Sequence, residues 1–145
     1  MRSQATFLDA CIFMYAAGAP HPYKDPCVQI LTDLEMGRLV AAVNTEIIQE
    51  ILYRYSHIGL ADKGLQLSRD ILRYSLTILP VTEEDIRLAM ELYDAHRAGG
   101  VKPRDVIHAA TMQRSGISRI LSTDKHFDQL GMVMRIDPLA YITKP

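Results

Sequence analysis

This sequence has few cysteines, no long apolar run and almost no excess of either charge. The two cysteines, Cys11 and Cys27, are too few for a disulfide scaffold, and no Cys-x-x-Cys pair occurs. No stretch of about 18 apolar residues is available to span a membrane. The first apolar stretch begins at Phe7 and is interrupted at Asp9, which does not fit a secretory leader. We therefore expect a cytoplasmic protein with reduced cysteines.

The net charge and the absence of certain motifs argue against further functional classes of protein. The formal net charge is −1 at pH 7, so no general surface for polyanions is implied. No Gly-x-x-x-x-Gly-Lys motif is present, which disfavours nucleotide hydrolysis by a phosphate-binding loop. No His and Cys cluster has the spacing of zinc ligands. Basic residues are concentrated in one region, where a solvated basic face is the simplest interpretation: Arg97, Lys102, Arg104, Arg114, Arg119 and Lys125.

Short apolar runs alternate with amphipathic segments along the 145 residues, of which 48% are hydrophobic. One domain over residues 1–145 accounts for this length and composition. Strands are predicted at 6–8, 39–43, 76–81, 119–122 and 132–136, the first leading into the apolar run 12–15. A Gly- and Pro-rich loop is predicted at 18–26, and helices at 27–35, 46–57, 61–74, 82–99, 104–115 and 125–130. This alternation predicts an α/β fold with a largely parallel sheet.

Four acids, Asp9, Glu50, Asp105 and Asp124, lie at or near the boundaries of apolar stretches expected in the core. Acids rarely stay buried unless they are paired or bind a cation. A parallel sheet binds ligands beyond the carboxyl ends of its strands, and Asp9 and Asp124 each follow a strand. The four acids together therefore suggest a site for a hard divalent cation, which prefers oxygen ligands.

Each acid also has an ordinary structural explanation. Asp105 would complement the positive end of the helix that it opens, and Asp124 would cap the helix that begins at Lys125. Glu50 would lie on a solvated helix face. Asp9 is the hardest to explain in this way, because apolar residues flank it on both sides.

The four acids and their neighbours resemble the PIN domain, a family of metal-dependent ribonucleases. The matching segments are FLDACIF (7–13), EIIQEIL (46–52), KPRDVIHAA (102–110) and ILSTDKHF (120–127). The resemblance covers about 6–136, is similar to the toxin-type, VapC-like members, and implies a three-layer α/β/α sandwich with a mostly parallel sheet. Ala10 departs from the family, where Thr or Ser often follows the first Asp. A hydroxyl that would orient the acid is therefore missing, unless another residue supplies it.

The resemblance implies catalytic roles for Asp9, Glu50, Asp105 and Asp124. The three aspartates would be ligands of Mg²⁺ or Mn²⁺, directly or through water. Glu50 would complete the site or position the attacking water as general base. Asp128, four residues after Asp124, would add a fifth acidic ligand, the alternative being an exposed helix charge.

Residues next to these acids have supporting roles in the same interpretation. Thr123 would hold the Asp124 carboxylate or a metal-bound water, or would act only as a helix cap. Lys102, Arg104 and Lys125 would bind the RNA backbone. His108 and His126 are expected to be packing or surface histidines.

The resemblance implies an endoribonuclease that cleaves single-stranded or structured RNA, the toxin of a toxin–antitoxin pair. It also implies a homodimer and a small antitoxin that covers the acidic site, with apolar residues of helices 27–35 and 46–74 forming the partner groove. One alternative is a PIN fold that binds RNA or protein without cutting. Another is a phosphohydrolase of small esters, whose aspartyl-phosphate route is disfavoured because no Asp-x-Asp pair begins at Asp9.

Overall fold

The computed structural model describes residues 4–143, in which five parallel strands form one sheet. The strand order is β3-β2-β1-β4-β5. Strand β1 is central, and its residue Phe7 lies opposite Ala42 of β2 and Ile120 of β4. The strands are β1 (Thr6–Leu8), β2 (Ala41–Asn44), β3 (Thr77–Leu79), β4 (Arg119–Leu121) and β5 (Met134–Ile136).

Helices connect the strands. The α-helices are α1 (Ala10–Ala17), α2 (Lys24–Glu35), α3 (Thr45–His57), α4 (Ala61–Arg73), α5 (Glu83–His96) and α6 (Pro103–Arg114). Short 3₁₀ helices are η1 (Arg97–Gly99), η2 (Lys125–Gln129) and η3 (Pro138–Ala140). None of the helices within residues 4–143 is both long enough and apolar enough to cross a membrane.

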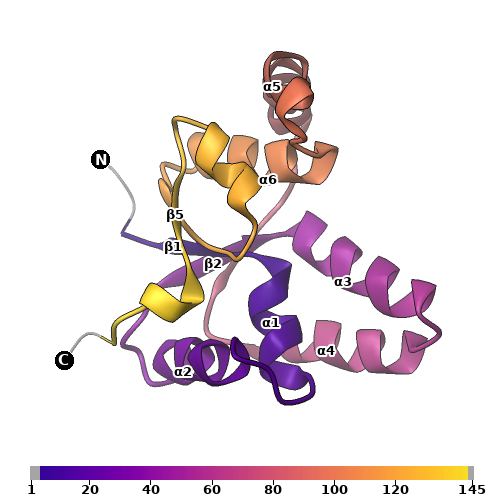
Figure 1. The fold of residues 1–145 in the computed structure, drawn as a ribbon, viewed down its shortest axis with the longest axis vertical. Helices are drawn as coiled ribbons and strands as arrows, with labels where there is room; N and C mark the ends of the chain where they lie inside the picture. Colours follow the sequence, from indigo (N-terminus) through magenta and orange to yellow (C-terminus); the bar gives the residue numbers. More distant parts are fainter. Residues whose placement is uncertain (1–3, 144–145) are drawn as a thin grey trace.

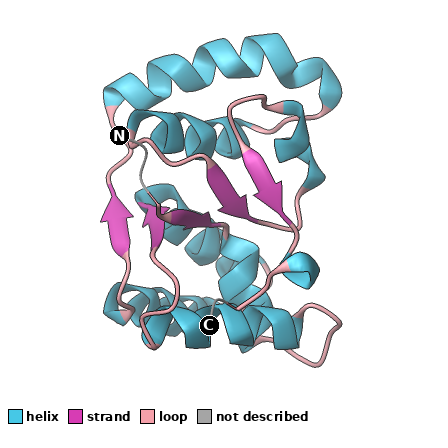
Figure 2. Cartoon of the chain, turned by 90° about the vertical axis from the view of Figure 1, so that its left-hand side faces the viewer, coloured by secondary structure: helices cyan, strands magenta, loops and turns pink. Residues whose placement is uncertain are grey.

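The sheet lies between two helical layers, with α5 and α6 above it and α2 and α4 below it in the view of Figure 1 (Figures 1 and 2). The chain moves from β1 to β2 and β3 in one direction, then returns across the sheet to β4 and β5. Because crossover connections are right-handed, the helices of connections that run toward one edge of the sheet cover one face, and those of connections toward the other edge cover the opposite face. The predicted three-layer α/β/α fold with a parallel sheet is confirmed.

This topology creates a switch point between β1 and β4, where the connections leave the sheet in opposite directions. Ligands of open parallel sheets bind at such a point, beyond the carboxyl ends of the strands. Asp9 directly follows β1, and Asp124 follows β4. The fold therefore places these two acids where a ligand site is expected.

Most predicted elements are found within a few residues of the expected bounds. The difference is at the start of the chain, where residues 12–15 lie in α1 and not in a continuation of the first strand. Asp9 follows β1 and caps this helix, in which Ile12 and Phe13 are fully buried. Helix α2 also begins inside the predicted loop, because Pro26 is tolerated in the first turn of a helix.

Candidate active site

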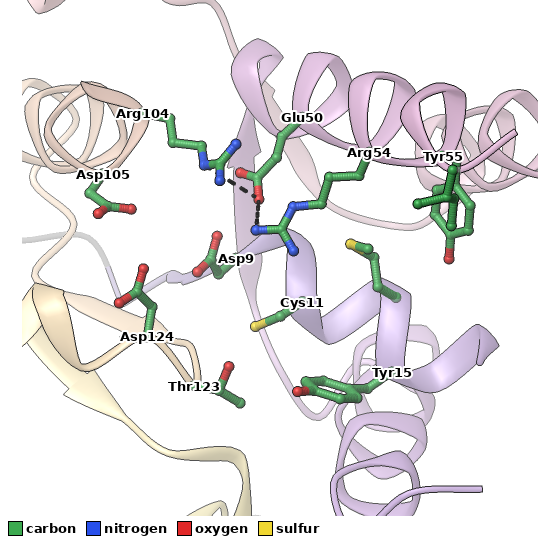
Figure 3. A pocket seen from close by; sticks show the side chains of 12 residues that line it. Asp9, Cys11, Tyr15, Glu50, Arg54, Tyr55, Arg104, Asp105, Thr123 and Asp124 are labelled. Carbon is green, nitrogen blue, oxygen red and sulfur yellow. Dashed lines mark ion pairs between the residues drawn. The ribbon is translucent and has the colours of Figure 1, made fainter. Parts of the chain in front are cut away.

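The four predicted acids line one cavity of about 380 Å³ (Figure 3). Asp9, Asp105 and Asp124 approach from the ends of β1, α6 and β4, while Glu50 reaches in from the second turn of α3. Asp9, Glu50 and Asp105 are at most 7% exposed. Residues far apart in the sequence thus bring their carboxylates together at the switch point of the sheet.

Local backbone contacts explain why the three aspartates point where they do. The Asp9 carboxylate accepts a hydrogen bond from the Ala10 amide (2.9 Å), and Asp124 accepts one from the His126 amide (2.9 Å). Asp105 is the third residue of α6 and accepts a hydrogen bond from the Lys102 amide (3.0 Å). Both structural explanations therefore hold, because Asp124 caps its helix and Asp105 lies in the first turn of α6, at the positive helix end. Each of these contacts uses one lone pair of a carboxylate oxygen, so helix-end contacts and cation binding are compatible.

Burial and the charges of neighbouring acids make Asp9 and Asp105 costly to ionise. Burial raises the pKa of Asp9, and the charge of Glu50 adds to this, against the opposing effect of His108 and Ser122. Burial also raises the pKa of Asp105 to about 6, with contributions from the charges of Asp124 and Asp9. A cation bound between these groups would relieve both the desolvation and the repulsion.

Glu50 is electrostatically different, because cationic side chains surround it. Its carboxylate lies 3.4 Å from the Arg54 guanidinium and 3.9 Å from that of Arg104 (Figure 3). It also lies 3.5 Å from His108 Nε2. Burial pushes the pKa of Glu50 up, but the hydrogen bond to His108 and the two arginine charges outweigh it and lower the pKa. Glu50 is therefore ionised near neutral pH and oriented from three sides.

The donor atoms fit divalent cations at two adjacent positions. Ligand atoms of Asp9, Glu50 and His108 all lie within 4.8 Å of one another, as do those of Asp105, Asp124 and His126. Carboxylate oxygens suit Mg²⁺ and Mn²⁺, and imidazole nitrogens are better ligands for the softer of the two. His108 packs on Phe7 as expected, with ring centroids 5.4 Å apart, yet it also faces Glu50.

Ser122 supplies a hydroxyl group that the sequence interpretation did not assign. Its Oγ donates to Asp9 Oδ2 at 2.6 Å and accepts from the Asp124 amide at 3.0 Å, and the residue is fully buried. The missing hydroxyl at Ala10 is thus replaced from the neighbouring strand end. A polar residue directly after β4, at the same sheet edge as Asp9, is the signal that would have identified it.

Thr123 and Cys11 line the cavity beside Asp9 and Asp124 (Figure 3). Burial and the charge of Asp9 raise the pKa of the Cys11 thiol to about 12. The thiol is therefore protonated at neutral pH and unsuited to act as a nucleophile. Arg54, which the sequence interpretation did not single out, joins Arg104 on the cavity wall.

Three other predicted site residues lie apart from this cavity. Asp128 is half-exposed and forms an ion pair with Arg135 at 2.9 Å, which lowers the pKa of its carboxyl group. In the described part of the chain, the cavity lining includes neither Asp128 nor Lys125 nor Lys102. Lys102 instead lines an adjacent hollow, together with Arg104.

A doubly wound sheet with four carboxylates at its switch point defines a class of α/β protein with an acidic site at the sheet edge. The PIN domain family matches residues 6–132, and the chain belongs to this family. Ribonuclease VapC23 of Mycobacterium tuberculosis is 36% identical over 120 residues, 81% of this chain and 91% of the relative. Ribonuclease VapC7 of the same species is 26% identical over 136 residues, 90% of each chain.

Solved structures share the fold at low sequence identity. Mycobacterium tuberculosis VapC20, described as a toxin that cleaves the sarcin-ricin loop, has a TM-score of 0.75 at 15% identity and covers 89% of this chain and 97% of its own. VapBC2 from Rickettsia felis, bound to a promoter DNA fragment, has a TM-score of 0.69 at 16% identity and covers 91% and 97%. At this identity the structures support the fold alone.

The raised pKa of Asp105 predicts that the stability of the metal-free protein depends on pH. Its folded pKa of about 6 lies above the ordinary 3.8, so its contribution to stability is complete below about pH 4 and is lost as the pH rises through 6. The raised pKa of Asp9 acts in the same direction. We expect the melting temperature in chelator to fall from about pH 5 to about pH 7. We expect Mn²⁺ to raise it more at the higher pH, because binding displaces protons.

Differential scanning fluorimetry of the wild type and Asp105→Asn checks this dependence. The Asn variant lacks the titrating group and should show a smaller fall of the melting temperature in chelator. Equal slopes in the two proteins would contradict the assignment.

Proposed function

We propose that this protein is a Mg²⁺- or Mn²⁺-dependent endoribonuclease and the toxin of a toxin–antitoxin pair. The observation that carries the proposal is the convergence of Asp9, Glu50, Asp105 and Asp124 in one cavity of a PIN domain. The relatives named ribonucleases support RNA as the substrate. This activity requires the four acids to serve one scissile phosphate, through a bound cation and an attacking water.

The residues of the cavity have different roles in phosphodiester hydrolysis. Asp9, in one of the two groups of ligand atoms, and Asp105 and Asp124, in the other, would hold divalent metal, and Ser122 fixes the Asp9 carboxylate through its short hydrogen bond. When bound, the divalent ion neutralises the phosphate oxygens and lowers the pKa of water. Glu50, kept ionised by its cationic neighbours, accepts the proton of the attacking water.

Arg54 and Arg104 have a second role in this assignment. Both guanidinium groups contact Glu50 in the substrate-free cavity, and both line the cavity wall. Guanidinium groups bind phosphate oxygens in bidentate geometry. They therefore orient the base and contact the RNA phosphates next to the cleavage position, with Lys125 further out along the backbone.

An apolar groove on the lower helical layer supports an antitoxin partner. Its volume is about 420 Å³, and it is lined mainly by residues of α1, α2 and α4, among them Phe13, Leu31 and Leu67. Glu35 and Asp70 are also in its lining, so an antitoxin segment with apolar and basic residues suits it. VapBC2 of Rickettsia felis and FitAcB of Neisseria gonorrhoeae are structural neighbours whose names join two components.

A homodimer in the cytoplasm is part of the proposal. Ile86, Met90 and Tyr93 of α5 lie at helical spacing and are 36–67% exposed. An apolar stripe of this kind on an outer helix is suited to a second copy of the chain.

Incubation of the purified protein with labelled single-stranded RNA in Mn²⁺, Mg²⁺ or chelator tests the proposal. We expect internal cleavage with either metal ion and none in chelator, with Mn²⁺ supporting the higher rate because two histidines border the site. RNA binding without cleavage in both metals would favour the non-catalytic PIN module. Cleavage that persists in chelator would contradict the metal-dependent assignment.

A further inference from the structure

A second hollow adjoins the active-site cavity, and Arg104 lines both. The hollow has a volume of about 410 Å³ and lies between α3 and the start of α6. Its lining consists of Glu46, Gln49, Tyr53, Lys102, Pro103, Arg104 and Ile107. The two depressions are therefore neighbours that share one cationic side chain.

Helix α3 separates the two depressions and contributes a different row of side chains to each. Glu50 and Arg54, one turn apart, line the active-site cavity. Glu46, Gln49 and Tyr53, at spacings of three and four residues, line the hollow. A chain that extends from the acids across Arg104 would therefore enter the hollow that Tyr53 lines.

Tyr53 provides the exposed aromatic surface of the hollow. The residue is 56% exposed, a large aromatic side chain in contact with solvent. Its ring lies nearly parallel to that of His57, with centroids 5.8 Å apart and an interplanar angle of 17°. The neighbouring His57 ring limits the orientations of Tyr53, so the phenol ring offers a stable flat surface.

The charges around this ring match a nucleotide. Lys102 and Arg104 place positive charge at the wall shared with the catalytic acids, while Pro103 and Ile107 add apolar surface. Glu46 and Gln49 offer polar groups for the edge of a base on the α3 side. An aromatic surface bordered by cations is the usual platform for an unpaired base and its phosphate.

We propose that this hollow is a nucleotide subsite of the RNA substrate. A base next to the scissile phosphate stacks on Tyr53, and its phosphate contacts Arg104 and Lys102. This inference rests on the proposed ribonuclease function, and it extends that function by requiring an unpaired base beside the cleavage position. A paired base cannot stack on a protein ring, so the subsite selects single-stranded segments.

Binding and cleavage by Tyr53 variants test the subsite. We measure the Kd of a short labelled single-stranded RNA by fluorescence anisotropy in chelator, and KM and kcat for the same RNA in Mn²⁺. Tyr53→Ala is expected to raise Kd and KM roughly 5- to 100-fold, with kcat changed less than about twofold. Tyr53→Phe keeps the ring and should match the wild type, whereas Tyr53→Leu keeps only the apolar bulk and should resemble Tyr53→Ala.

Lys102→Ala tests the phosphate contact independently. It should weaken binding to all sequences alike and reduce the slope of log Kd against log salt by about 1. A paired RNA duplex should bind the wild type and Tyr53→Ala equally well, because no base reaches the ring.

The outcomes separate this inference from the proposed function. Cleavage by the wild type that is lost in chelator supports the nuclease, whatever Tyr53 does. Unchanged Kd and KM in Tyr53→Ala, or wild-type behaviour of Tyr53→Leu, would overturn the subsite and leave the hollow to a protein partner. A wild type that binds no single-stranded RNA in either assay would overturn it as well.

Discussion

Asp9→Asn is expected to abolish metal-dependent RNA cleavage while raising the melting temperature of the metal-free protein. The buried Asp9 carboxylate is costly to ionise and lies near that of Glu50. Asparagine has nearly the same shape and no charge, so it removes this cost but offers a poor metal ligand. The loss of cleavage should be on the order of 10³-fold, the equivalent of several kcal/mol of transition-state stabilisation.

Two measurements with a matched control variant check this prediction. Cleavage rates in Mn²⁺ give the first effect, and melting temperatures with chelator and with Mn²⁺ give the second. Mn²⁺ should stabilise the wild type and not Asp9→Asn. Asp128→Asn serves as the control, because Asp128 is paired with Arg135 outside the cavity and its variant should keep cleavage.

Either of two results would count against this assignment. Rapid cleavage by Asp9→Asn would point to a different site or to a contaminating nuclease. A loss of cleavage in Asp128→Asn as large as that in Asp9→Asn would restore Asp128 as a fifth acidic ligand.

The sequence predicted the part of the site that depends on strand ends. Asp9 and Asp124 follow apolar runs of strand length, and the carboxyl ends of parallel strands share one edge of the sheet. Glu50 and Asp105 lie on helices, whose position over the sheet depends on crossovers that periodicity does not specify. Their place in the site, like the strand order, followed from the family resemblance.

The side chains that surround the acids were less predictable, because their partners are distant in sequence. Ser122 and Asp9 are separated by 113 positions, and their hydrogen bond depends on the pairing of β1 with β4. For Asp128, by contrast, a short-range spacing in the sequence indicated a side-chain position that the structure does not have. Its four-residue spacing from Asp124 indicates one face of an α-helix, but Asp124 is the cap of a 3₁₀ helix with three residues per turn. Asp128 is therefore turned toward Arg135.

A buried polar network joins the helices that carry Glu50 and Asp105. Asp85, in the first turn of α5, is 1% exposed and accepts hydrogen bonds from Arg114 Nε (2.6 Å) and Thr111 Oγ1 (3.0 Å). Thr111 in turn accepts from Asn44 Nδ2 at 3.1 Å, and Asn44 caps α3. The side chain of Arg114 also donates to the Pro80 carbonyl at 2.9 Å. The network thus connects α3, α5, α6 and the end of β3.

Arg114→Ala is expected to destabilise the fold by roughly 3 kcal/mol, because it leaves the buried Asp85 carboxylate without its cation. For a chain of this size the melting temperature should fall by roughly 6 to 12 °C. Arg87→Ala on α5, the helix that carries Asp85, is the matched control. Its partner Glu83 is 81% exposed, and exposed pairs one turn apart contribute at most about 0.5 kcal/mol.

Urea unfolding of both variants in chelator gives the two free energies directly, without a contribution from bound metal. Arg114→Ala should also need more Mn²⁺ for half-maximal cleavage, because the network orients the helices that carry two of the acids. Equal stabilities of Arg114→Ala and Arg87→Ala would contradict the role of the network. A destabilised Arg114→Ala with an unchanged Mn²⁺ requirement would restrict that role to the fold and leave the geometry of the acids to the sheet alone.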